Sequence, residues 1–168
     1  YGHLAPEVDR ERGRVRQRPL VLDEVLAGYP PEARPWILRG VGAHLRTRVP
    51  ARVDSPRHLR RWLDAAFADE ERRGFIAEGL GMSLEYPLRR RYAVDARQTE
   101  RVLREVPDDL RVAVRRGQGI DLGVRLRIGL AGAEERVRAT VDETKDPAQR
   151  EALRGAIEAE AGRELSAR

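Results

Sequence analysis

A pair of glycines separated by one residue recurs three times along the chain, and this recurrence constrains the fold more than any other feature. The three segments that carry it run from Arg34 to Leu45, from Arg73 to Leu84 and from Arg111 to Leu122. Aligned in register, their glycines coincide at intervals of 39 and 38 residues: Gly40, Gly42, Gly79, Gly81, Gly117 and Gly119. A fixed period of roughly 20 to 50 residues is the signature of a repeat architecture, so we predict a tandem repeat.

A shorter element recurs between these segments. Pairs that are mostly apolar follow one another at intervals of 37, 40 and 38 residues: Val25–Leu26, Trp62–Leu63, Val102–Leu103 and Thr140–Val141. Leu22 and Leu26 have the i, i+4 spacing of one face of a helix. Acidic residues precede the glycine segments, and Asp146–Pro147 has the chemistry of a helix start. Each unit therefore predicts a short helix of about ten residues, a tight turn and a longer helix that contains the glycines.

These patterns predict an all-α fold in which two-helix repeats of 38 to 39 residues stack as a short α-solenoid or a curved helical bundle. We expect a single domain over residues 1–168. It would contain a partial copy, three copies and a degenerate capping copy, with approximate bounds 1–31, 32–68, 69–106, 107–145 and 146–168. In the last copy Gly155 stands 38 residues after Gly117, and charged Glu151 and Glu160 fall at apolar positions, as expected of a terminal unit.

The glycine pair has two interpretations. A glycine inside a helix costs roughly 1 kcal/mol relative to alanine, so two in each copy require a reason. Close packing supplies one, because a missing Cβ lets a neighbouring helix approach. A phosphate-binding loop is the alternative, but that motif needs a preceding strand and a third glycine. We therefore assign the six repeated glycines a structural role and predict no cofactor.

Composition narrows the cellular setting. The chain has 33 basic and 28 acidic residues, and Lys145 is its only lysine, an arginine bias typical of a GC-rich, bacterial-type genome. The absence of cysteine excludes disulfides and thiolate metal sites. No apolar run approaches the roughly 20 residues of a membrane span. We expect a cytoplasmic protein with no membrane partner.

Residues that could carry catalysis form no convincing group. The histidines are His3, His44 and His58, and the last two could form a metal site with Asp54 or Asp64. Their separation of 14 residues does not match the spacing of three or four residues usual for helical metal motifs. We predict no catalytic or metal-ligating residue, and an enzyme or metal protein is the least favoured function.

Arginines mark the most informative surface. They gather after the glycine pairs, at Arg46, Arg48, Arg52, Arg89, Arg90, Arg91, Arg125 and Arg127. In a stacked array equivalent positions align, so these side chains would form a basic edge. The leading hypothesis is a non-catalytic protein–protein interaction or scaffold module with a protein partner. The alternative is binding of nucleic acid or another polyanion along the basic edge. Self-association as a homo-oligomer stays open.

Overall fold

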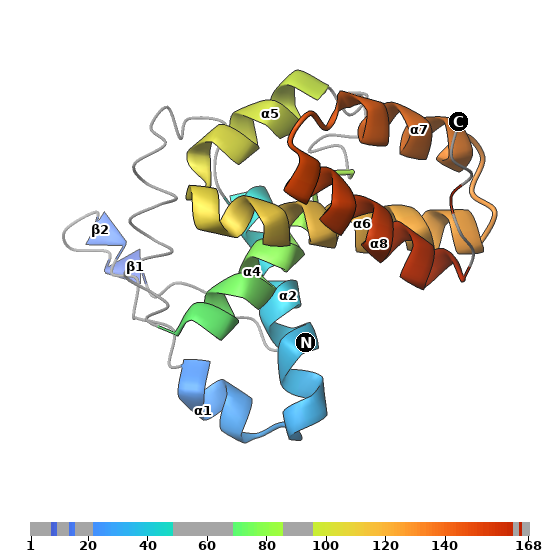
Figure 1. Ribbon diagram of the computed structural model, residues 1–168. Coiled ribbons are helices and arrows are strands. Elements are labelled where there is room, and N and C mark those ends of the chain that lie inside the picture. The colour runs from blue at the N-terminus through green and yellow to red at the C-terminus, as the bar shows by residue number, and fades with distance from the viewer. Residues whose placement is uncertain are drawn as a thin grey trace. The chain divides into compact units, whose positions relative to one another are not determined.

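The computed structural model describes residues 8–9, 14–15, 22–48, 69–85, 96–162 and 165, and this part of the chain is mostly helical (Figure 1). Its seven α-helices are α1 (Leu22–Ala27), α2 (Arg34–Arg48), α4 (Glu70–Met82), α5 (Ala96–Glu105), α6 (Arg111–Arg127), α7 (Ala133–Glu143) and α8 (Pro147–Ala161). Two short 3-10 helices precede α2 and α6: η1 (Pro31–Ala33) and η2 (Asp108–Leu110). The all-helical class predicted from the sequence is confirmed, apart from two strands of two residues each.

The chain divides into two units, Tyr1–Arg34 and Pro35–Arg168. In the first unit, β1 (Val8–Asp9) pairs antiparallel with β2 (Arg14–Val15), and α1 and η1 follow. The second unit holds almost all of α2 and every later helix, so the candidate site described below belongs to it alone.

Two long helices of the second unit begin with a side-chain cap. Asp69 accepts hydrogen bonds from the backbone N–H groups of Glu71 and Arg72, at 2.9 and 3.3 Å, and so starts α4. Asp146 accepts from Gln149 N at 2.8 Å, and Pro147 occupies the first turn of α8. An aspartate cap satisfies a backbone donor that the first helical turn leaves unpaired. The helix start predicted at Asp146–Pro147 is confirmed.

The long helices α2, α4, α6 and α8 contact one another in chain order, and glycines form the contacts. A Cβ placed on Gly42 of α2 would collide with the backbone carbonyl of Ile76 in α4. In the same crossing, a Cβ on Gly79 would collide with the carbonyl of Arg39. The α4–α6 crossing repeats this arrangement, with Gly81 against Val114 and Gly117 against Glu78. The second glycine of one helix therefore packs beside the first glycine of the next, backbone against backbone.

The α6–α8 crossing keeps the geometry but changes one residue. Gly119 of α6 packs against the Leu153 carbonyl, and a Cβ there would lie 2.8 Å from Ala156 Cβ. Ala156 thus occupies the place that Gly79 and Gly117 hold in the earlier helices. The sequence alignment had put Gly155 there, one residue too early, and no other described atom lies within 4 Å of a Cβ at Gly155. Alanine is small enough for this crossing, so the alignment of the glycines predicted the wrong register for α8.

The hydrophobic core of the C-terminal part lies between α6, α7 and α8. Its buried members are Leu122, Val137, Leu153 and Ile157. The turn from α6 to α7 contains Gly129 and Gly132, with φ angles of 66° and 77°, a region that side chains with a Cβ rarely adopt. This tight turn brings α7 back into contact with α6.

Candidate binding site

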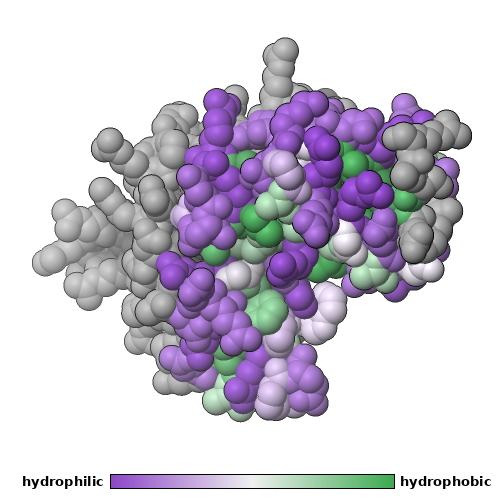
Figure 2. Space-filling view, in the orientation of Figure 1, coloured by the Kyte–Doolittle hydropathy of each residue, from purple (hydrophilic) through white to green (hydrophobic). Residues whose placement is uncertain are grey.

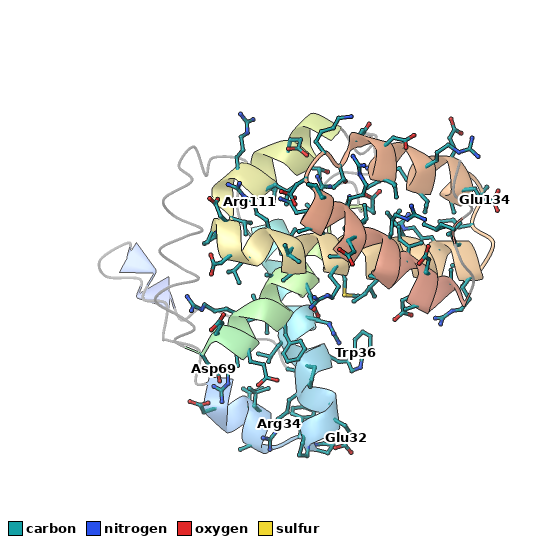
Figure 3. The ribbon with its side chains drawn as sticks, in the orientation of Figure 1. Glu32, Arg34, Trp36, Asp69, Arg111 and Glu134 are labelled. Atoms are coloured by element: carbon teal, nitrogen blue, oxygen red, sulfur yellow. The ribbon has the colours of Figure 1, made fainter. Side chains whose placement is uncertain are left out.

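Charged side chains at one repeat position link the first three long helices. Glu78 of α4 is buried and accepts from Arg39 of α2 through Nε and NH2, at 2.8 and 2.7 Å. Its other oxygen accepts from Arg116 of α6 at 3.1 Å. Arg39 also lies over the rings of Trp36 and Phe75, 4.6 and 5.2 Å from their centroids. Trp36 itself projects from α2 and is 55% exposed (Figure 3).

A second, deeper set of polar residues surrounds Glu85, which follows α4 and is 3% exposed. Arg136 of α7 donates to both carboxylate oxygens of Glu85, with Nε at 2.7 Å and NH2 at 3.1 Å. Gln118 of α6, which is fully buried, donates through Nε2 at 2.7 Å. Two parallel N–H···O bonds from one guanidinium fix both the distance and the orientation of the carboxylate. Glu85 therefore ties α6 and α7 to the end of α4.

The network continues from Gln118 to α5. Arg115, 4% exposed, donates through NH1 to Gln118 Oε1 at 2.8 Å and through NH2 to Glu100 Oε1 at 2.9 Å. Among the atoms that the structure describes, Arg115 Nε is buried and has no hydrogen-bond partner. We call the chain Arg136–Glu85–Gln118–Arg115–Glu100 the polar relay. It spans three helices and the end of a fourth.

The pKa values of the two relay arginines shift in opposite directions. Desolvation lowers the pKa of Arg115, although the nearby Glu100 carboxylate partly offsets this effect. The hydrogen bonds that Arg136 donates to Glu85 raise the pKa of Arg136. Both guanidinium groups stay charged at neutral pH, because the ordinary pKa of arginine lies far above 7. The relay therefore contains two ion pairs, each with one buried partner, and the neutral amide of Gln118 joins them.

The relay forms part of the wall of a pocket of about 720 Å³ among α5, α6, α7 and the start of α8. The described residues that line it all carry polar groups, although the carbon atoms of their side chains form much of the wall: Thr99, Glu100, Arg115, Gln118, Arg136, Thr140, Asp142, Glu143, Lys145, Asp146 and Gln149. Small-molecule and cofactor pockets have volumes of roughly 300–1,000 Å³. The hydroxyl of Thr140 donates to the carbonyl of Arg136 in its own helix, at 2.8 Å. The charged and amide groups of this pocket are thus placed to hold and orient a polar ligand.

Sequence reasoning missed every residue of the relay, although the repeat alignment contains a signal for two of them. Between the paired glycines the earlier copies have Val41 and Leu80, whereas the third copy has Gln118. Three positions before, the apolar Ala77 is replaced by Arg115. Polar residues that replace apolar ones at core positions of a single copy indicate a local site. Glu85, Glu100 and Arg136 carry no comparable signal.

The arginines predicted to form a basic edge have varied placements. Arg46 and Arg48 lie in the last turns of α2, and Arg52, Arg89, Arg90 and Arg91 lie outside the described residues. Arg125 is half-buried, pairs with Asp121 at 2.6 Å and donates to the Glu85 carbonyl at 3.4 Å. Arg127, 58% exposed at its side chain, pairs with Glu160 at 3.6 Å. The two members whose side chains are described both have acidic partners, and Figure 2 shows a face that is mostly hydrophilic with scattered hydrophobic areas.

The remaining sequence candidates do not assemble. His44 lies exposed on α2, and His3 and His58 lie outside the described residues. Within the described ranges, no three His, Cys, Asp or Glu side chains are grouped as metal ligands would be. Likewise, none of the helices described here has the length and apolar character needed to cross a bilayer.

Comparison with protein-family models, with curated proteins and with solved structures finds no match. Any functional assignment therefore has to come from the chemistry of the pocket and the polar relay.

Proposed function

We propose that this chain is a non-catalytic interaction or scaffold module, built from stacked two-helix repeats that present a partner-binding pocket. The repeated glycine crossing supports the repeat architecture, because three successive pairs of long helices meet at equivalent positions. Stacked helical repeats bind partners along surfaces formed by equivalent elements. We place this function in the cytoplasm, in keeping with the cysteine-free composition.

The observation that carries the proposal is the polar relay at the pocket. Burying Arg115 and Glu85 costs several kcal/mol of desolvation for each ion, and hydrophobic residues of similar volume are often as stable. The neighbouring α4 has apolar Ala77 and Leu80 at the positions of Arg115 and Gln118, and it packs with the same crossing. Packing alone therefore does not require these polar side chains, which is what a binding role would explain.

Site-specific photo-crosslinking in cells of the source organism tests this proposal. A photoreactive residue at Gln149, on the pocket wall, should yield a discrete protein adduct. The same residue at the exposed Asp109, which does not line the pocket, is the matched control and should yield none. An adduct between two copies of the chain would identify the partner as a homo-oligomer. Equal labelling from both positions, or no protein adduct from either, would contradict the proposal.

Binding of nucleic acid or another polyanion is the alternative proposal. Fewer arginines now support this alternative, because Arg125 is paired with Asp121 and Arg127 with Glu160. It relies on the remaining arginines, and above all on residues 89–91. Reversing these three to glutamate should flatten the dependence of log affinity on log salt by roughly 2 to 3 units. If the unaltered chain fails to bind single- and double-stranded nucleic acid at low salt, this alternative is wrong.

A further inference from the structure

We propose that the pocket receives a guanidinium or ammonium group that stands next to a hydrogen-bond acceptor, as an arginine or lysine residue of a partner protein would present. The inference rests on the proposed function, because it names the chemistry of the partner. It follows from the charge balance of the pocket and from the hydrogen bonds that the polar relay leaves unmade.

Among the described residues that line the pocket, anionic groups outnumber cationic ones. They supply three cationic groups, Arg115, Arg136 and Lys145, and four anionic groups. Glu85, directly behind Arg136, adds a fifth anionic group. The arginines are already matched, since Arg115 pairs with Glu100 and Arg136 with Glu85. The excess is therefore negative, and a concave site focuses such a field and attracts a cation.

The unmatched charge lies at the pocket's edge, on the last residues of α7. Asp142 and Glu143 are exposed, and no hydrogen bond or ion pair reaches their carboxylates from the described residues, although Glu143 attracts Arg115 and Arg136 at longer range. The other two acids have structural tasks, because Asp146 caps α8 and Glu100 binds Arg115. Lys145 donates to the Asp142 backbone carbonyl at 3.0 Å and adds only one positive charge. An exposed carboxylate suits a planar guanidinium or a compact ammonium.

The deeper part of the pocket needs a hydrogen-bond acceptor rather than a cation. Arg115 is 4% exposed and lines the pocket, and within the described structure its Nε–H donates to no acceptor. A buried donor without an acceptor is unfavourable and rare in folded proteins. A backbone carbonyl of a bound peptide would supply the acceptor after a small shift of the side chain. A ligand that combines a cationic side chain with a nearby carbonyl therefore fits better than a free amine, which carries no acceptor.

The test is an NMR titration of the full ¹⁵N-labelled chain with a blocked Gly-Arg-Gly peptide. Amides of residues 99–100, 115–118 and 140–149 should shift, together with the Arg115 Nε–H signal. The same peptide with neutral citrulline in place of arginine has nearly the same shape and should bind about tenfold more weakly. Ethylguanidinium, which has the cation without the carbonyl, should also bind more weakly than the arginine peptide.

A pair of matched variants locates the contact. Replacing both Asp142→Asn and Glu143→Gln should weaken binding of the arginine peptide about tenfold. The control changes Asp109→Asn and Glu135→Gln, two exposed acids that do not line the pocket, and should leave the affinity unchanged.

Equal binding of the arginine and citrulline peptides would overturn the cation assignment. Tighter binding of ethylguanidinium than of the peptide would contradict the claim that the cation belongs to a residue of a partner protein. Phosphate shifting the same amides more strongly than the peptide would overturn the sign of the site's charge. A protein adduct from Gln149 without peptide binding would refute this inference alone, whereas peptide binding without an adduct would refute the scaffold proposal.

Discussion

Helices α4 and α6 occupy equivalent repeat positions and contact their neighbours in the same way, yet they carry different chemistry. In both, the first glycine packs against the preceding long helix and the second against the following one. At the positions between and before these glycines, α4 has Leu80 and Ala77 whereas α6 has Gln118 and Arg115. The comparison separates two roles within one segment. Glycines set the approach of the backbones, and the intervening side chains determine whether the helix contributes to a core or to a binding pocket.

The largest loss of stability is predicted for a substitution at one of the glycines that this comparison identifies. Gly117→Ala places a methyl group onto the Glu78 backbone carbonyl, so α4 and α6 have to separate. We expect a loss of about 3 kcal/mol or more in the free energy of unfolding. Gly155→Ala is the matched control, because no described atom lies near a Cβ there and alanine favours the helix by up to about 1 kcal/mol. Chemical denaturation of both variants decides the matter, and equal stabilities would disprove the packing role of Gly117.

Breaking the polar relay predicts an intermediate effect. Glu85→Ala removes the carboxylate that holds Arg136 twice and Gln118 once. We expect a loss of about 2–3 kcal/mol, less than for a fully buried pair, because Arg136 is 26% exposed and regains water. Glu135→Ala, an exposed acid on the same helix as Arg136, should change stability by less than about 0.5 kcal/mol. A Glu85 variant as stable as this control in urea unfolding would show that the relay does not join the helices.

The smallest stability effect is predicted for the change that sharpens the comparison most. The double substitution Arg115→Ala and Gln118→Leu gives α6 the side chains that α4 carries at these positions. Because both partners of one hydrogen bond leave together, we expect stability to stay within about 1 kcal/mol of the original chain. Glu85 keeps both Arg136 bonds, and Glu100 is 56% exposed and can be hydrated. Binding of the arginine peptide should nevertheless fall, because the Arg115 donor is gone.

Calorimetry and the peptide titration, performed on the same double variant, distinguish the outcomes. A large loss of stability would mean that Arg115 and Gln118 serve the fold. Unchanged stability with unchanged binding would mean that the pocket does not use them. The contrast with α4 therefore yields a test in which structural and functional roles predict different results.

The register of α8 shows where the spacing of the glycines stops predicting which residues make the helix contacts. Glycines 38 and 39 residues apart locate the crossings of α2, α4 and α6, because only glycine tolerates a carbonyl at that distance. At α8 the same rule pointed to Gly155, but Ala156 makes the contact. One methyl group fits where the crossing is slightly wider. A spacing rule therefore identifies a contact only where no residue other than glycine fits.

The sequence by itself determined the helical class, the long helices, the Asp146–Pro147 start and the residues that bring α2, α4 and α6 together. These follow from local periodicity, capping chemistry and the absence of a Cβ, which are properties of neighbouring residues. Only the tertiary structure decided the polar relay, because Glu85, Gln118 and Arg136 are 18 to 51 residues apart and meet through helix packing. A carboxylate and a guanidinium each look like ordinary surface charges in a sequence. Burial and pairing, which turn them into a site, exist only after the helices have stacked.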